Sequence, residues 1–229
     1  ATHSQRSASA TNPAWCVSGS VGTANNTLSR DRITSLLARC SACAHSNVVS
    51  HKATRINPSA SVGTAATVKA FHSAFDSLKG MDALLLDGRG MGGGGDAEAW
   101  EMCGRLFPKG VSNGRNGRIE PSGSWQFDGP VVFLQDERMV SSAETFAWAV
   151  TETERTLSVG RRTGGWGIIP NVFECPSGIV KFRLGVNDRP TPIRGVHTEG
   201  VGWPADIELP YGPVICSRKD PALEFGLAT

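Results

Sequence analysis

Two serines at a strand-to-helix boundary are the first residues of this chain that could do chemistry. Ser141 and Ser142 follow an apolar run at residues 131–134 and precede a segment with helical apolar spacing, with Glu144 in its first turn. In α/β proteins the carboxyl end of a strand is where ligands commonly bind. Main-chain N–H groups at a helix N-terminus can also stabilise an anion. Serine is equally a preferred helix cap, so a purely structural role remains open at this point.

A cluster of glycines is the second candidate feature. Six of the eight residues at 88–95 are glycine, and they follow a short apolar strand pattern at residues 81–87. Consecutive glycines let main-chain N–H groups approach a ligand closely. A phosphate-binding loop would need a GxxxxGK[ST] pattern, which is absent. Two interpretations remain: a main-chain oxyanion hole for acyl transfer, or a flexible turn before a helix at residues 96–106.

A serine nucleophile needs a base, and the histidines are the candidates. A free hydroxyl is a weak nucleophile unless a base lies within hydrogen-bond reach. Of the five histidines, His3 lies in a polar N-terminal stretch and His72 lies within an amphipathic helix pattern. His51 lies on an expected early strand, and His45 and His197 are alternatives. If none of them acts as the base, the protein is a binding protein or uses different chemistry.

The elements that would position these residues form two strand–helix–strand units. The first has strands at 47–56 and 81–87 around a helix at 64–78, and the second has strands at 131–134 and 157–159 around a helix from 142. Such units build parallel sheets with right-handed crossovers. A hairpin pattern follows at 171–186, and a last short strand at 205–209. We therefore predict an α/β fold, a mixed sheet flanked by helices, with a C-terminal β-hairpin.

Composition narrows the classes of partner and cofactor. The 229 residues include 23 Lys+Arg and 21 Asp+Glu, so charge gives no reason to expect a nucleic-acid partner. No apolar run approaches the roughly 20 residues of a membrane span. Cys40 and Cys43 have CxxC spacing, but no second pair completes a zinc set, so neither a metal nor another cofactor is expected. Asn25 begins a glycosylation sequon, which has meaning only in a secreted protein. A secreted or extracytoplasmic location is slightly favoured.

The chain divides into three parts by pattern. Residues 1–26 are rich in Ser, Thr, Ala and Gly and are expected to form a loosely ordered arm. Residues 27–215 carry all the periodic segments and are expected to form the α/β domain. Residues 216–229 are expected to be a C-terminal tail.

Three blocks of sequence, in this order, resemble a known family. They are LLLDGRGMGGGG at 84–95, VVFLQDERMVSSAETFAWAV with VGRRTGGWG at 131–167, and EGVGWPADIEL at 199–209. The series resembles the C-terminal-processing (tail-specific) serine peptidases and their tricorn-like relatives, over about residues 47–209. The resemblance implies the crotonase/caseinolytic-protease-like sheet-and-helix spiral. No Gly-Leu-Gly-Phe-like motif is present, so a PDZ-type module is not expected in this chain.

The resemblance also implies a nucleophile and an oxyanion hole. The family's nucleophile falls on Ser141, and the oxyanion donors fall on the main-chain N–H of Ser142 and of Gly92 or Gly93. One departure concerns the asparagine of the family's glycine block, which is Met91 here. A polar side-chain contact is therefore expected to be lost at that position.

The family's two branches differ in their base, and the sequence fits one of them better. Bacterial and chloroplast members take a lysine from the loop where this chain has Trp166. Tricorn-like members pair the serine with an early-strand histidine and a glutamate, and the glutamate falls on Glu199. The aligned strand position is Arg55, and His51 lies four residues upstream, on the same face of a strand. We therefore expect Ser141, His51 and Glu199 to act together.

The sequence thus predicts a serine hydrolase, a peptidase of the tail-specific or tricorn-like type acting through an acyl-enzyme. Trp166 and Thr163 are expected to contact a peptide or protein substrate. No nucleic acid and no membrane span are expected, and a homo-oligomer is left open. The alternative is a non-catalytic protein on the same fold that binds a peptide or small molecule, as the retinoid-binding relatives of these peptidases do.

Overall fold

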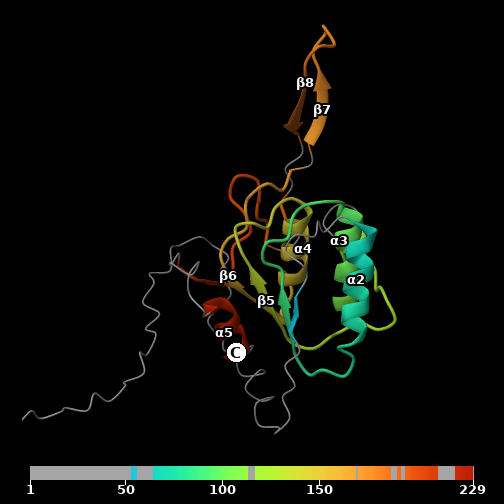
Figure 1. Ribbon diagram of the computed structural model, residues 1–229, viewed down its shortest axis with the longest axis vertical. Helices are drawn as coiled ribbons and strands as arrows, with labels where there is room; N and C mark the ends of the chain where they lie inside the picture. Colours follow the sequence, from blue (N-terminus) through green and yellow to red (C-terminus); the bar gives the residue numbers. More distant parts are fainter. Residues whose placement is uncertain are drawn as a thin grey trace, which may run out of the picture.

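A parallel β-sheet forms the centre of the computed structural model (Figure 1). The structure describes residues 53–55, 64–112, 117–168, 170–186, 190–191, 194–210 and 220–228. The sheet has five strands in the order β1-β2-β5-β6-β9, and every neighbouring pair is parallel. The strands are β1 (Ala53–Arg55), β2 (Leu84–Asp87), β5 (Val131–Gln135), β6 (Thr156–Gly160) and β9 (Ile207–Glu208). The predicted arm at 1–26 lies outside the described residues.

The central strands are buried on both faces, which explains their continuous apolar sequence. All residues of β2, β5 and β6 are buried, as is typical of a parallel sheet covered on both sides. In register, Leu86 lies beside Phe133, and Phe133 lies beside Ser158. The predicted mixed sheet is wrong in one respect: the antiparallel pairs form separate two-stranded sheets, because the crossovers leave the main sheet wholly parallel.

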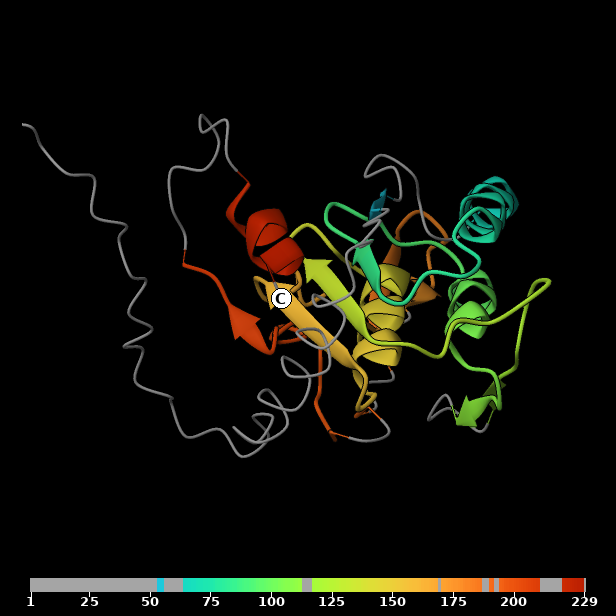
Figure 2. The same ribbon diagram turned by 90° about the horizontal axis from the view of Figure 1, so that it is seen from below.

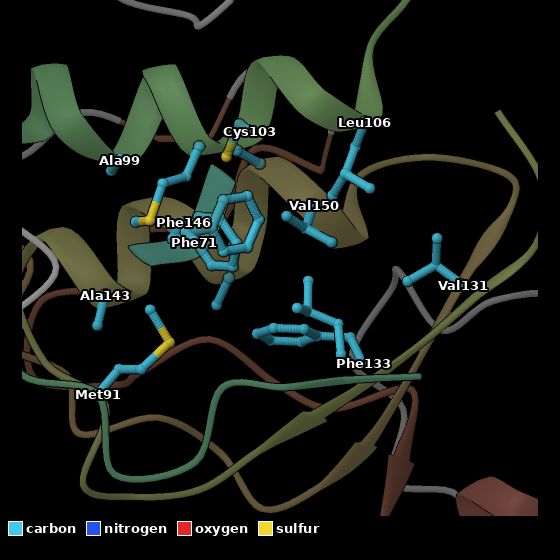
Figure 3. Packing of buried hydrophobic residues seen from close by; sticks show 14 of the residues in the cluster. Phe71, Met91, Ala99, Cys103, Leu106, Val131, Phe133, Ala143, Phe146 and Val150 are labelled. Carbon is cyan, nitrogen blue, oxygen red and sulfur yellow. The ribbon is translucent and has the colours of Figure 1, made fainter. Parts of the chain in front are cut away.

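Three of the described helices are stacked on one side of this sheet. Next to the strands lies α4 (Ser142–Thr151), then α3 (Asp96–Cys103), which continues as a 3-10 turn, η1 (Gly104–Leu106), and then α2 (Ala65–Asp76) (Figures 1 and 2). Their shared core contains Phe71, Met91, Phe133 and Phe146 (Figure 3). Alternate strand residues point to opposite faces, so Phe133 enters this core while its neighbours Val132 and Leu134 face the other side.

The opposite face of the sheet is covered by α5 (Pro221–Ala228), where the sequence predicted a tail. Ala222 is buried with the side chains of Val132 and Leu134. A Cβ on Gly226 would lie 3.2 Å from Val132 Cγ1 and 3.3 Å from Leu134 Cδ2, so the helix packs directly on the strands. Among the described helices, none is both long and apolar enough to cross a bilayer.

In the part of the chain that the structure describes, two antiparallel pairs lie outside the main sheet. The shorter joins β3 (Val111–Ser112) to β4 (Arg118–Ile119). The longer joins β7 (Pro170–Glu174) to β8 (Lys181–Gly185), and it projects away from the body (Figure 1). An α/β fold with a hairpin near its C-terminal end is therefore confirmed.

Candidate active site

Ser141 has an unusual backbone conformation at the N-terminus of α4. With φ 57° and ψ −128°, it is the one non-glycine residue with a positive φ in the part of the chain that the structure describes. Such conformations cost on the order of 1–3 kcal/mol and persist only where the surroundings enforce them. Here the main-chain N–H donates to Trp166 O at 2.9 Å, and Ser141 O accepts from Glu144 N at 2.8 Å. These bonds hold an exposed serine at a tight turn between β5 and α4.

The glycine loop packs directly against this serine. A Cβ on Gly93 would lie 2.5 Å from Ser141 Cβ and 2.9 Å from Ser141 Oγ, so only glycine fits there without a shift. A Cβ on Gly92 would meet nothing within 4 Å. Ser142 is buried, and its hydroxyl donates to Gly94 O at 2.8 Å, which ties the loop to the first turn of α4. The structure thus brings together four residues that the sequence assigned to one site: Ser141, Ser142, Gly92 and Gly93.

A buried carboxylate, Glu144, connects the serine turn to the loop at 161–167. It is 1% exposed and accepts four hydrogen bonds: from Thr163 Oγ1 at 2.5 Å, Gly165 N at 2.9 Å, Trp166 N at 2.7 Å and Ser141 N at 3.3 Å. Burial raises the pKa of this carboxyl, and the hydrogen bonds partly oppose that rise. The acid expected at the start of α4 therefore holds the main chain of Ser141 and of the loop at 161–167 in place.

Thr163 and Trp166, the two expected substrate contacts, differ in position. Thr163 is 5% exposed; its hydroxyl donates to Glu144 and accepts from Trp203 N at 2.6 Å. Both polar functions of the hydroxyl are thus used inside the protein, where Thr163 holds the loop at 161–167 to Glu144. Its expected contact with a substrate stays a prediction. The Trp166 ring is 70% exposed, while its main chain contacts Ser141 and Glu144.

Glu199 lies on a turn that packs against the same loop. Gly200 N donates to Gly165 O at 2.7 Å, and Glu199 Oε2 accepts from Ile168 N at 2.9 Å. Gly165 has φ 79°, and a Cβ there would lie 2.9 Å from Gly202 N, so this close approach of two turns needs glycine. The last sequence block is therefore joined to the loop that contacts Ser141 through Trp166.

Of the candidate histidines, the structure describes His72 and His197. His51, the expected base, and His45 lie outside the described residues. His197 is exposed, two residues before Glu199. His72 lies on α2 in the outermost helix layer, with Nε2 3.4 Å from Glu101 Oε1, which agrees with a packing or solvated role (Figure 1).

Two Asp–Arg pairs that the sequence interpretation did not use hold the start of the glycine loop. Arg89 donates from Nε and Nη2 to the Asp87 carboxylate at 2.9 Å and 2.8 Å. Asp136 Oδ1 accepts from Gly90 N at 2.8 Å, and its other oxygen accepts from Arg138 Nη2 at 2.6 Å. The signal for the first pair was the D-x-R spacing in the first block. These pairs connect the loops after β2 and β5.

Met91, at the position where the resemblance implied an asparagine, points into the core rather than toward the site. It is fully buried and lies near Ala143 in the helix-side core (Figure 3). Its side chain therefore anchors the glycine loop through apolar packing.

Comparison with solved structures identifies the fold. The tricorn protease matches with a TM-score of 0.60 and 20% identity, over 82% of this chain and 18% of that one. A candidate peptidase from Parabacteroides merdae matches with a TM-score of 0.59 and 22% identity, over 70% of this chain and 56% of that one. Mature CPAF complexed with lactacystin matches with a TM-score of 0.53 and 16% identity, over 62% and 42%. The chain thus covers less than two thirds of each of these structures.

The family model for peptidase family S41 matches residues 55–209. That range includes the glycine loop, the Ser141 turn, the loop at 161–167 and the turn at Glu199. The match covers more than half of the chain, so this protein belongs to peptidase family S41.

Proposed function

We propose that this protein is a serine peptidase of the tail-specific or tricorn-like type, with Ser141 as its nucleophile. Ser141 Oγ attacks the carbonyl carbon of a peptide bond, and a base takes the hydroxyl proton. The proton then passes to the leaving amine, and water releases the acyl group from Ser141 in a second, equivalent step. The main-chain N–H groups of Ser142 and of Gly92 or Gly93 stabilise the oxyanion.

The observation that carries this proposal is the packing of Gly93 against a strained, exposed Ser141. A helix cap needs neither a positive φ nor a glycine pressed against its side chain. Ser142, as the first residue of α4, has a main-chain N–H without an intrahelical acceptor. A hydroxyl beside such donors is the arrangement that acyl transfer needs.

For the base we propose His51, with Glu199 orienting its imidazole. The support for His51 comes from sequence: it precedes β1 (Ala53–Arg55), whose Arg55 lies beside Asp87 of β2 in register. Glu199 has structural support, because its turn packs on the loop that contacts Ser141. His51→Ala would then reduce ester turnover about as far as Ser141→Ala, since members of such a unit are non-additive.

A pair of variants separates nucleophile from cap. Ser141→Ala should lower the kcat for a p-nitrophenyl ester by at least about a thousandfold and abolish labelling by a fluorophosphonate probe. Ser142→Ala keeps its main-chain N–H and should retain labelling, with lower thermal stability because the bond to Gly94 O is lost. If both variants keep full activity on every ester and peptide tried, Ser141 is a cap and the proposal is wrong.

The second candidate is a non-catalytic binding protein on the same fold. Met91 in place of the family's asparagine, and tryptophan in place of its lysine, favour it. A wild-type protein that is inert to the fluorophosphonate probe, yet folded, would support this candidate.

A further inference from the structure

The β7–β8 hairpin presents an apolar face to solvent. Phe173 lies opposite Phe182 in register, with stacked rings whose centroids are 5.5 Å apart. Leu184 lies on the same face because it is two residues from Phe182, and Val180, whose carbonyl accepts from Cys175 N, extends that face. The exposed fractions are 38% for Phe173, 47% for Phe182, 54% for Leu184 and 53% for Val180. We call these four side chains the apolar face.

The other face of the hairpin carries its charges. Val172 lies opposite Arg183, and Glu174 Oε2 pairs with Lys181 Nζ at 2.9 Å. The apolar face itself has no charged member. A partner of the apolar face therefore needs apolar side chains and gains nothing from charge.

The size of the apolar face indicates what kind of partner fits. A fully buried aromatic side chain removes about 150–250 Å² from water. At the exposed fractions above, the four side chains together offer on the order of 300 Å², and the 70% exposed Trp166 ring adds roughly 150 Å², whereas a stable protein interface needs about 800 Å² from each partner. This area is too small for a stable dimer, and it suits one extended segment alongside five-residue strands of about 17 Å.

The hairpin is attached directly to the candidate active site. Its base follows the loop at 161–167, and Ile168 N donates to Glu199 Oε2. A Cβ on Gly185 would lie 2.7 Å from Ile168 Cγ2, so the end of β8 packs on that residue. Trp166, whose ring is exposed, lies between Ser141 and the hairpin along the chain. Figure 1 shows the hairpin projecting from the body beyond α4.

We propose that the apolar face, together with Trp166, is a docking surface for an extended apolar segment of the polypeptide substrate. This rests on the proposed peptidase function and names its substrate class: unfolded chains with an apolar stretch beside the cleaved bond. A two-stranded hairpin is only marginally stable in water by itself, and a third, apolar segment laid against it would stabilise it. Docking would also hold the substrate near Ser141.

Binding tests the proposal without needing turnover. In a Ser141→Ala background, a fluorescein-labelled 12-residue peptide with five central apolar residues is titrated by anisotropy. Leu184→Ser combined with Phe182→Ser should weaken binding at least tenfold. Val172→Ser makes the same kind of change on the opposite face and should alter binding less than about twofold. A peptide with five central serines should bind weakly to all variants, and circular dichroism checks that each is folded.

The outcomes separate this proposal from the proposed function. With Ser141 restored, the double variant should raise KM for the apolar peptide while leaving turnover of the small ester unchanged. If Val172→Ser weakens peptide binding as much as the double variant does, the docking surface is overturned and the peptidase proposal stands. The same holds if the double variant loses as much activity on the small ester as on the peptide. The wild type could also be a dimer that becomes a monomer in the double variant while peptide binding is unchanged. That result assigns the apolar face to a second copy of the chain and overturns the docking proposal. Absent ester turnover refutes the peptidase function alone, because the anisotropy result still decides docking.

Discussion

At the scale of single residues, the contact between Gly93 and Ser141 sets the geometry of the site. A side chain at Gly93 would need space that Ser141 Cβ and Oγ already occupy, at 2.5 Å and 2.9 Å. A Cβ on Gly92, one residue earlier, would meet nothing within 4 Å. The two glycines are therefore chemically identical but sterically different.

We expect Gly93→Ala to lower ester kcat/KM about a hundredfold, comparable to the loss of one oxyanion donor. Displacement of Ser141 is the physical reason, so the loss should appear in kcat. Gly92→Ala is the matched control and should change kcat/KM less than about threefold, since its Cβ clashes with nothing. Steady-state kinetics on the same ester check both variants; equal effects would mean that the packing of Gly93 is unimportant.

The environment of Glu144 predicts how the stability of the protein depends on pH. Burial raises its pKa above the ordinary 4.5, so the folded state favours the protonated form. The stability that this group contributes is then fully present below about pH 4.5 and falls as pH rises through the raised pKa.

We expect Glu144→Gln to remove this dependence. The amide must also point an N–H₂ group at donors from Gly165 or Trp166, which should cost about 1–3 kcal/mol of unfolding free energy. Urea unfolding of both proteins between pH 4 and pH 8 should show the wild-type advantage shrinking as pH rises. An advantage that grows with pH would contradict the assigned direction of the pKa shift. Glu101→Gln, an exposed acid on α3, is the control.

At the scale of elements, α5 is connected to the glycine loop through its first residues. Asp220 caps the helix by accepting from Leu223 N at 3.1 Å, and it also accepts from Arg89 Nη1 at 2.8 Å. Arg89 holds Asp87 with its remaining nitrogens. One guanidinium thus joins the C-terminal helix to the loop that contacts Ser141.

Asp220→Asn should lower the free energy of unfolding by about 1–2 kcal/mol, since it removes a charge-assisted bond and the negative charge at the helix N-terminus. The hydrogen bond from Arg89, the largest cause, lowers the pKa of Asp220 below 3.8. Its contribution is therefore present above that value and is lost as pH falls through the lowered pKa. Glu224→Gln, an exposed acid on the same helix, should change stability by less than about 0.5 kcal/mol. Thermal unfolding at pH 7 and pH 3 measures both; equal Tm values at pH 7 would contradict the link.

At the scale of the whole molecule, two cysteines report different levels of structure. Cys103 is fully buried in the helix-side core, and burial raises the pKa of its thiol well above 9.0. Cys175 is half-buried at the end of β7, on the projecting hairpin. Alkylating agents react with thiolates. Cys103 is therefore protected from alkylation both by its burial and by its raised pKa, which keeps the thiol protonated.

We expect iodoacetamide to label Cys175 in the native protein within minutes to hours and Cys103 only through global unfolding. The labelling rate of Cys103 should rise with urea in parallel with the unfolded fraction. Peptide mass spectrometry after pulsed alkylation measures both sites. If Cys103 is labelled as fast as Cys175 without denaturant, the three-layer packing of α2, α3 and α4 on the sheet opens locally.

The sequence was sufficient wherever neighbouring residues determine the structure. The apolar run of β5, the serines that begin α4 and the turn of the β7–β8 hairpin were all predictable, because strand burial and capping depend on local pattern. The family was also predictable from the order of its blocks, and the match at 55–209 confirms it. The role of His51 stays a prediction.

Only the tertiary structure decided the contacts between distant segments. Residues 216–229 were expected to be a tail, whereas the structure has α5 at Pro221–Ala228. Eight residues have little helix stability alone, and Asp220, which precedes this helix, bonds to Arg89, 131 residues earlier in the chain. Thr163 was expected to contact the substrate, and only the fold brings Glu144 and Trp203 to its hydroxyl. Met91 was seen as a missing polar contact, yet its burial shows what replaces that contact. Local sequence fixes which backbone each segment prefers, but which side chains meet depends on how the sheet and its crossovers place those segments in space.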